Sequence, residues 1–343
     1  MAETQTAARK TPMNRAIREA LEYEMENDPA VFMMGEDIGM FGGIYQTATG
    51  FLEKFGEERV RDTPISEAGF IAAAAGAALA GMKPVVELMF VDFVGVCLDP
   101  IYNMAAKNAY HSAGRQPVPM VLVTAVGGGM SDASQHSQTL YATFAHLPGL
   151  KIVVPSNAYD ARGLMHAAIR DPNPVIYMIH KQVSGMQWFH PVKEADNAVP
   201  QEPYEVPIGQ AFVRREGTDV TLVGWGVTLY YALDAARRLE KEGVSAEVID
   251  LCSIVPMDRD TIFASVRKTG RLVVVDEDYR NCGVAGEIIA SVTERDVSVL
   301  KASPKRVAFP DIPIPYSPPM EFFARPDADK VVEAVLNGVM RRD

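Results

Sequence analysis

The sequence predicts an α/β protein made of two doubly wound domains. Strand-like and helix-like patterns alternate through the first half, a segment with several prolines and no sustained period interrupts them, and the alternation then resumes. Such alternation implies a parallel sheet covered by helices on both faces, and 343 residues suit about two or three domains. We therefore expect a flexible N-terminus at 1–12, an α/β domain at 13–182, a linker at 183–206 and a second α/β domain at 207–343.

Hydrophobic periodicity defines the elements expected in the first domain. Residues 13–27 place Ile17, Leu21 and Met25 at helical spacing, and Asp28-Pro29 ends the pattern. The same reasoning predicts helices at 67–80, 92–110 and 160–169, and buried strands at 31–34, 85–89, 120–124, 151–154 and 175–179. A turn-rich stretch at 35–43 and three consecutive glycines at 127–129 lie between them, and we expect the glycines to be flexible.

The second domain shows the same alternation of strand and helix patterns. Strands are expected at 220–223, 246–249 and 272–275, and helices at 228–241, 258–266, about 286–293 and 329–340. The proline-rich stretch from Phe309 to Pro319 is predicted to be an extended surface segment.

Composition excludes several classes of function. The formal net charge of −11 disfavours nucleic acid as a partner, because phosphate binding requires clustered Lys and Arg. Cys97, Cys252 and Cys282 lie far apart and form no CxxC pair, which favours a reducing compartment over a zinc site or a disulfide framework. The longest apolar run, Phe70 to Ala80, is too short to span a bilayer, and the N-terminus lacks the apolar core of a secretory signal. We expect a cytoplasmic protein without a membrane partner.

The common cofactor and nucleophile fingerprints are missing. The sequence contains no GxGxxG after a strand, no GxxxxGK[ST] and no GxSxG. A nicotinamide oxidoreductase is therefore disfavoured. A two-domain α/β protein without its own phosphate loop needs its chemistry from another source.

The stretch from Asp62 to Phe70 places Ser66 and Glu67 at the expected start of a helix. One interpretation is structural: Ser66 caps the helix, and the helix dipole stabilises the Glu67 carboxylate by roughly 0.3–1 kcal/mol. The other interpretation is catalytic. Phe70, Ile71 and a run of alanines follow Glu67, and a carboxyl held against such an apolar wall has its pKa raised by desolvation, ready to share a proton.

Four blocks of the sequence are more specific than any single motif. They are Asp62 to Phe70, Val86 to Phe93, Ser134 to Gln138, and Leu147 to Pro155. In order and spacing they resemble the β subunits of thiamine-diphosphate-dependent 2-oxo acid dehydrogenases, which include pyruvate, acetoin and branched-chain enzymes. The resemblance runs from about Met13 to the C-terminus. It implies an N-terminal transketolase-like pyrimidine-binding domain and a transketolase C-terminal-like domain.

The resemblance implies catalytic or cofactor-binding roles for four side chains. Glu67 matches the glutamate that hydrogen-bonds N1′ of the thiamine diphosphate aminopyrimidine, where acid–base help is typically worth about 10²–10⁴-fold. Met89 and Phe93 match positions that pack on the aminopyrimidine, although their spacing alone is more typical of plain core. His136 matches a catalytic histidine near the lipoyl group. A lone histidine is usually structural, but the polar neighbours from Ser134 to Gln138 favour a site wall here.

The resemblance also implies where metal ions are bound. The backbone carbonyls of five residues match a structural potassium site of some relatives: Met120, Ala168, Ile169, Asp171 and Asn173. The sequence from Asp171 to Pro174 is equally typical of a helix-terminating turn. Magnesium and the cofactor's diphosphate are held in the family by a Gly-Asp-Gly motif on the α subunit, and this sequence contains no Gly-Asp-Gly. The chain should therefore bind only the pyrimidine half and be inactive alone.

The resemblance implies assembly into a heterotetramer of two α and two β subunits, and transfer of the acyl group to a lipoyl group on an acyltransferase component. The acidic cluster Asp276-Glu277-Asp278 is either a contact for that component's docking domain or a solvated loop. The block from Val86 to Phe93 favours pyruvate or acetoin as the substrate, with branched-chain 2-oxo acids as an alternative. The acidic Asp132 in the segment before His136 departs from the family's pattern and bears on how the lipoyl group approaches.

Two other classes of function compete with this interpretation. A self-sufficient transketolase-like enzyme needs its own diphosphate-binding domain, for which 343 residues leave no room. A noncatalytic α/β binding protein that shares only the fold is the other alternative, and thiamine diphosphate binding with and without an α subunit distinguishes it.

Overall fold

The computed structural model describes residues 9–340 and divides them into two compact units. The first unit contains the chain up to Val126 together with Leu147–Ile208, and the second contains Gly127–His146 together with the chain from Gly209. The segment Gly127–His146 packs with the second unit, whereas the domain expected at 13–182 includes it, and the expected domain bounds stay a prediction. Residues 1–8 of the expected flexible N-terminus lie outside the described residues.

The first unit is built on a parallel sheet, as the alternating pattern predicted. Its strands are in the order β6-β7-β5-β4-β2-β3, and every pair of neighbours in that order is parallel. The strand bounds are β2 (Val31–Gly35), β3 (Val60–Asp62), β4 (Lys83–Phe90), β5 (Val121–Val126), β6 (Lys151–Val153) and β7 (Val175–His180). Helices accompany them: α1 (Met13–Asn27), α2 (Phe51–Phe55), α3 (Glu67–Leu79), α4 (Val94–Asp99), α5 (Ala106–His111) and α7 (Ala158–Arg170).

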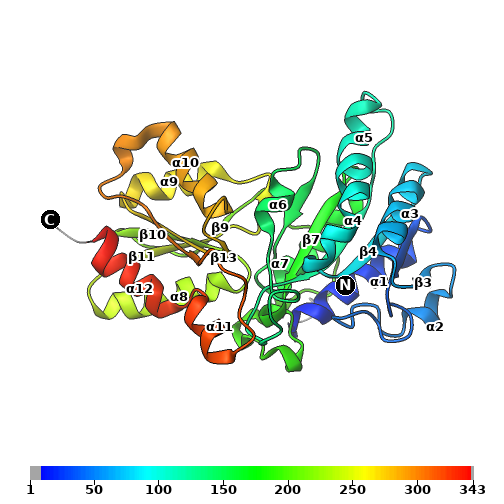
Figure 1. Cartoon of the computed structure of the whole chain (residues 1–343), viewed down its shortest axis with the longest axis horizontal. Coiled ribbons are helices and arrows are strands. Elements are labelled where there is room, and N and C mark those ends of the chain that lie inside the picture. The colour runs from blue at the N-terminus through cyan, green and yellow to red at the C-terminus, as the bar shows by residue number, and fades with distance from the viewer. Residues whose placement is uncertain (1–8, 341–343) are drawn as a thin grey trace, which may run out of the picture. The chain divides into compact units, whose positions relative to one another are not determined.

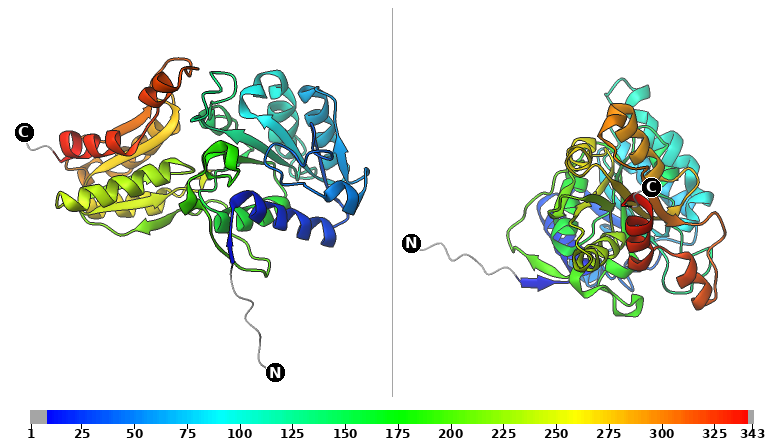
Figure 2. Two further views of the ribbon diagram at one scale, coloured as in Figure 1. Left: turned by 90° about the horizontal axis from the view of Figure 1, so that it is seen from below. Right: turned by 90° about the vertical axis from the view of Figure 1, so that its left-hand side faces the viewer.

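Helix α1 shows how sequence periodicity becomes packing in this unit. Its buried residues include Ile17, Leu21 and Met25, which lie on one face at a spacing of four. That face packs beside α7, where Glu24 Oε1 lies 2.6 Å from His166 Nδ1 and 2.7 Å from Arg170 Nη2. In the left view of Figure 2, α1 lies on the side of the unit opposite the cyan helices α4 and α5. Helices thus cover both faces of the sheet.

The structure refines one expectation for the first unit and corrects another. The single helix expected at 92–110 is divided into a 3-10 turn (Val91–Phe93), α4, a π-helical segment (Pro100–Ala105) and α5. Cys97 has non-helical dihedrals, and Pro100 lacks the N–H that a continuous helix needs. Residues 9–11, expected to be flexible, form β1 (Arg9–Thr11), which pairs antiparallel with β8 (Asn197–Val199) inside the expected linker. The expected linker also contains 3-10 turns at Gln187–Phe189 and Lys193–Ala195.

The second unit has a sheet in the order β14-β13-β10-β11-β9. Its strands are β9 (Phe212–Arg215), β10 (Val220–Gly224), β11 (Ala246–Asp250), β13 (Leu272–Tyr279) and β14 (Lys305–Phe309). Strand β9 is antiparallel, and the other neighbours are parallel. Helices α8 (Thr228–Lys241) and α12 (Ala328–Glu333) lie on one face, and α9 (Arg259–Thr269) and α10 (Val284–Asp296) on the other (Figure 1).

Further short elements of the second unit were missed by the sequence analysis. They include β9 and β14 of the sheet, together with α6 (Tyr141–Ala145), β12 (Ser253–Val255) and α11 (Pro318–Ala324). The expected extended stretch is therefore shorter than predicted, since α11 begins at Pro318, and the expected C-terminal helix continues from α12 as a π-helical segment (Ala334–Val339). No helix among residues 9–340 combines the length and apolarity that crossing a bilayer requires.

Candidate active site

The carboxyl edge of the first unit's sheet gathers Glu67, Met89 and Phe93, the side chains that the sequence singled out for the cofactor. Ligands of open α/β sheets bind at this edge. Glu67 is half-buried in the first turn of α3. Ser66 occupies the position before the helix, but its side chain does not cap it, and its Oγ donates to the carbonyl of Pro64 at 3.2 Å. The capping interpretation of Ser66 is therefore wrong, while Glu67 keeps a favourable place at a helix N-terminus.

A second carboxyl, Glu36, lies directly after β2 at the same edge. Burial, the charge of Glu67 and the charge of Asp37 all raise the pKa of Glu36. Its Oε1 is buried without a hydrogen-bond partner among the described residues. The charge of Glu67 therefore favours the protonated form of Glu36.

A third carboxyl, Glu87, is buried within β4. Its Oε1 accepts a hydrogen bond from the amide of Ile44 at 2.9 Å, and a Cβ on Gly43 would lie 2.6 Å from both carboxylate oxygens. Only glycine lets the loop close so tightly over this group. Burial raises the pKa of Glu87 to about 7, and the charge of Glu36 adds to that increase. The site thus contains the half-buried carboxyls of Glu67 and Glu36 and the buried carboxyl of Glu87.

Sequence reasoning missed Glu36 and Glu87, although a signal for each was present. Glu36 is the first polar residue after a buried strand, and Glu87 is an acidic residue within an apolar strand pattern. Asp62 of the first sequence block also has a clear contact, because its Oδ1 accepts from the amide of Gly39 at 2.6 Å. This bond holds the loop after β2 against β3.

Met89 and Phe93 lie at the same edge, at the end of β4 and in the turn that follows it. Both are half-buried, and the rings of Phe90 and Phe93 pack edge to face with centroids 5.6 Å apart. The ammonium of Lys181, a fully buried residue directly after β7, lies 5.1 Å from the centre of the Phe90 ring. Sequence reasoning missed Lys181, although a lysine that follows an apolar strand is itself a signal.

His136 lies in the second unit, on a loop whose ends are close together. The amide of Gly127 donates to the carbonyl of Gln138 at 2.9 Å and closes the loop. His136 is half-buried near one end of it. Tyr279 OH donates to Oε1 of Gln138 at 3.3 Å, so the loop is tied to the end of β13.

The acidic cluster at 276–278 is buried, which corrects both of its expected interpretations. Asp276, Glu277 and Asp278 belong to β13 and are at most 5% exposed, so they form neither a surface contact nor a solvated loop. Backbone amides satisfy them: Asp276 Oδ2 accepts from Ala285 at 3.2 Å, and Asp278 Oδ2 accepts from Ala142 at 3.2 Å. Burial and the charge of Asp278 raise the pKa of Asp276.

The five residues of the expected potassium site precede β5 or lie at and after the end of α7 in the first unit. Met120 lies just before β5, and its carbonyl accepts from the amide of Val175 at 2.9 Å. Ala168 and Ile169 belong to the last turn of α7, and Asp171 follows its end. Asp171 Oδ1 accepts from the amide of Asn173 at 2.9 Å, and Oδ2 pairs with Lys151. The helix-terminating turn is thus present, and the potassium site stays a prediction.

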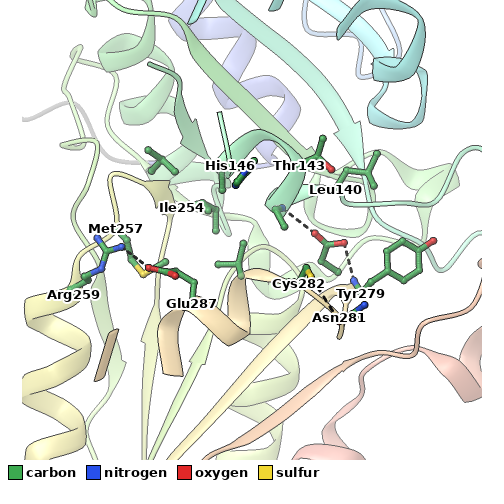
Figure 3. A pocket seen from close by; sticks show the side chains of 16 residues that line it. Leu140, Thr143, His146, Ile254, Met257, Arg259, Tyr279, Asn281, Cys282 and Glu287 are labelled. Carbon is green, nitrogen blue, oxygen red and sulfur yellow. Dashed lines mark hydrogen bonds and ion pairs between the residues drawn. The ribbon is translucent and has the colours of Figure 1, made fainter. Parts of the chain in front are cut away.

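The second unit also contains a cavity of about 590 Å³ that none of the expected site residues lines. Its wall carries Ile254, Met257 and Cys282, together with the ion pair of Arg259 and Glu287 at 3.0 Å (Figure 3). The cavity is therefore lined by both apolar and polar side chains, and Arg259 and Glu287 in its wall neutralise each other.

Comparison with known proteins assigns both units to sequence families. The family described as "Transketolase, pyrimidine binding domain" matches residues 9–186. The family described as "Transketolase, C-terminal domain" matches residues 209–331. Together these matches cover most of the chain.

Curated relatives match along nearly their whole length. The beta subunit of acetoin:2,6-dichlorophenolindophenol oxidoreductase from Cupriavidus necator is 43% identical, over 95% of this chain and 97% of that protein. Subunit beta-2 of the mitochondrial pyruvate dehydrogenase E1 component from Oryza sativa is 44% identical, over 98% and 88%. The 2-oxoisovalerate dehydrogenase subunit beta of Bacillus subtilis is 42% identical, over 93% and 96%.

A solved structure supports the fold independently. A split-gene transketolase, described as an inactive β4 tetramer, matches with a TM-score of 0.77 over 97% of this chain and 99% of that chain, at 23% identity. From the two domain families and the full-length relatives, the chain belongs to the transketolase-like family of β subunits of 2-oxo acid dehydrogenase E1 components, which includes pyruvate, acetoin and branched-chain members.

Proposed function

We propose that this chain works with an α subunit in thiamine-diphosphate-dependent turnover of a 2-oxo acid or of acetoin, with Glu67 as its acid–base residue. The observation that carries the proposal is the set of three carboxyl groups at the carboxyl edge of the first unit's sheet. Glu67 is half-buried at the start of α3, and its charge contributes to the raised pKa of Glu36. Glu87 is buried in the core and has a raised pKa. Such grouped carboxyls are typical of sites that hold and move a proton.

The residues of this edge fit the pyrimidine half of the cofactor. Glu36 has a buried carboxyl oxygen without a hydrogen-bond partner among the described residues, so this edge favours retention of a proton. Met89 and Phe93 offer half-buried apolar surface to a planar ring. When bound, thiamine diphosphate supplies the electron sink for decarboxylation that amino-acid side chains lack.

Each protein group then has a distinct task. Glu67 holds a proton at the pyrimidine nitrogen, and Glu36 is the neighbouring carboxyl whose pKa the charge of Glu67 raises. Met89 and Phe93 orient the ring by packing. His136 donates a hydrogen bond where the lipoyl group of the acyltransferase component reacts, from a loop that belongs to the second unit.

Magnesium and the diphosphate half are proposed to be held by the α subunit, because this sequence contains no Gly-Asp-Gly motif. A potassium ion would be held by the carbonyls of Met120, Ala168, Ile169, Asp171 and Asn173. The end of α7 suits a cation, because the last carbonyls of a helix lack partners within the helix.

Exposed apolar surface supports assembly with other chains. Ala73, Gly76 and Leu79 lie on the outward face of α3, where small residues allow another backbone to approach. Tyr316, just before α11, and Phe323, on α11, are 74% and 83% exposed. Such exposed apolar side chains are typical of protein contact surfaces. We propose that an α subunit and a second copy of this chain cover such surfaces in a heterotetramer. The lipoyl group of the acyltransferase component remains the proposed acceptor of the acyl group. Residues 276–278 are buried and do not contribute to the docking of that component.

Pyruvate or acetoin is the proposed substrate, and branched-chain 2-oxo acids are the alternative, since relatives of all three kinds match at 42–44% identity. Cytoplasm is the proposed location, although the rice relative is named mitochondrial. A noncatalytic binding protein is the competing function. The grouped carboxyls oppose it, because they leave buried polar atoms that a purely structural site would satisfy.

The test is a substrate panel on the assembled enzyme. This chain is co-expressed with a family α subunit that carries Gly-Asp-Gly, and turnover of pyruvate, acetoin and branched-chain 2-oxo acids is measured with thiamine diphosphate, magnesium and a dye acceptor. We expect turnover of pyruvate or acetoin that requires the cofactor. Association of the two chains without cofactor-dependent turnover of any of these substrates would favour the noncatalytic alternative.

A further inference from the structure

The glycine-rich loop before His136 is held by a buried carboxylate on α11. Glu321 is 0% exposed. Its Oε1 accepts from the amide of Gly129 at 2.6 Å, and its Oε2 accepts from the amide of Ser131 at 2.9 Å and from the Ser131 hydroxyl at 3.2 Å. The expectation that glycines 127–129 are flexible is therefore wrong, because both oxygens of one buried side chain bind this stretch of backbone.

The loop's backbone is shaped to fit that carboxylate. A Cβ on Gly128 would lie 2.7 Å from Glu321 Oε1, so any other residue would push the loop and this carboxylate apart. Gly129, Ser131 and Ala133 all have positive φ angles, which the two non-glycine residues adopt only at a cost of about 1–3 kcal/mol each. Such a conformation persists only when surrounding contacts impose it, and Glu321 supplies three of them.

A second buried carboxylate holds the start of the same loop. Glu277 Oε1 accepts from the amide of Gly128 at 2.7 Å, and its Oε2 accepts from Arg325 at 3.2 Å. Arg325 also donates to Tyr231 OH at 2.9 Å. The guanidinium therefore offsets part of the negative charge that two buried carboxylates place beside the loop.

We propose that Glu321 is a positioning residue for His136, acting through the backbone of residues 128–131. The inference rests on the proposed function, which gives His136 its role toward the lipoyl group. Gly127 and Gln138 close the loop, so fixing its first half limits where its second half can place the imidazole. A displacement of about 1 Å in such a group costs up to about 100-fold in rate.

The first experiment measures the loop directly and needs no α subunit. Hydrogen exchange is followed in the full chain for wild type, Glu321→Gln and Glu247→Gln. The carboxamide NH₂ of Gln would face donors where a carboxylate oxygen now accepts, so exchange of peptides covering 127–138 should rise about 10–100-fold in Glu321→Gln. Glu247 is the matched control, since it is also buried, pairs with Lys268 and accepts from the Gly217 amide at 3.3 Å.

The second experiment places the same change in the assembled enzyme. Acylation of a lipoyl domain and reduction of a dye are both measured for wild type, Glu321→Gln, His136→Gln and the double variant. Glu321→Gln should lower the ratio of lipoyl acylation to dye reduction by at least about tenfold. Because Glu321 acts through His136, it should add nothing further in the His136→Gln background.

The outcomes separate this inference from the function on which it rests. Unchanged exchange at 127–138 in Glu321→Gln, or additive effects in the double variant, would overturn the positioning role while leaving the proposed function intact. Absence of turnover by the wild-type assembly overturns both. If Glu321→Gln fails to fold, Gly128→Ala tests the same contact from the loop side, because its Cβ must displace the loop from Glu321. It should lower the same ratio by a similar factor, and an unchanged ratio would contradict the inference.

Discussion

Glu67 and Glu87 are carboxyl groups of the same site with different surroundings. Glu67 is half-buried at a helix N-terminus, where it can meet a ligand. Glu87 is 4% exposed, and the loop through Gly43 closes over it. The first is therefore suited to exchange a proton with a bound group, and the second to influence charge from within the core.

Replacing Glu67 by Gln removes the exchangeable proton and keeps the shape of the side chain. In the assembled enzyme, Glu67→Gln should lower the dye-coupled turnover at least about 100-fold, the lower end of acid–base contributions. Glu53→Gln is the control, because Glu53 is exposed on α2 and in the same unit. Turnover of Glu67→Gln at the wild-type rate would remove Glu67 from the mechanism.

Burial of Glu87 predicts a pH dependence of stability. Its pKa is about 7 in the folded chain and 4.5 in the absence of structure, so the folded state retains a proton that the unfolded state releases between these values. The free energy of unfolding should therefore decrease as the pH rises through this window, by roughly 3 kcal/mol at its upper end. Glu87→Gln removes this loss. The unfolding midpoint of Glu87→Gln relative to that of wild type should therefore rise from about pH 5 to about pH 8 in thermal unfolding of the full chain. A difference between the two midpoints that stays constant over this range would refute the raised pKa of Glu87.

At the scale of elements, the local sequence predicted some helices correctly, and it failed to predict the breaks or the presence of others. The helices expected at 13–27 and 228–241 are confirmed by α1 and α8, because their apolar periodicity and their buried faces coincide. The helix expected at 92–110 is present as consecutive helical segments, but its periodicity does not reveal the non-helical dihedrals at Cys97 or the π-helical segment from Pro100. Helix α6 has only five residues and carries too short a pattern to be recognised.

Two glycines give opposite predictions for the same substitution. Gly149 has φ of +105°, and an added Cβ would lie 1.9 Å from the carbonyl oxygen of Ala106. Gly149→Ala should therefore lower the free energy of unfolding by about 2 kcal/mol or more. Gly76 lies within α3 with no atom within 4 Å of an added Cβ, so Gly76→Ala should raise it by up to about 1 kcal/mol. Urea unfolding of the full chain compares them, and equal effects would contradict this account of the two positions.

At the scale of the whole molecule, sequence predicted the two-unit α/β fold and singled out Glu67, Met89 and Phe93, which the structure places at the carboxyl edge of one sheet. It did not reveal that Gly127–His146 belongs to the second unit. Hydrogen bonds connect this segment to Glu277 and Glu321, which lie more than a hundred residues further along the chain. The burial of residues 276–278 was missed for the same reason, because acidic side chains satisfied by distant amides look like surface residues in a sequence.

The central claim is that this chain contributes the acid–base half of a site that another chain completes. Reconstitution tests it most directly: a fixed amount of this chain is titrated with a Gly-Asp-Gly-bearing α subunit, and cofactor-dependent turnover of pyruvate and of acetoin with a dye acceptor is measured at each ratio. We expect no turnover by either chain alone, and activity that rises with added α subunit and saturates at equal amounts of the two. Cofactor-dependent turnover by this chain alone, or a stable equimolar assembly that never turns over substrate, would contradict the account.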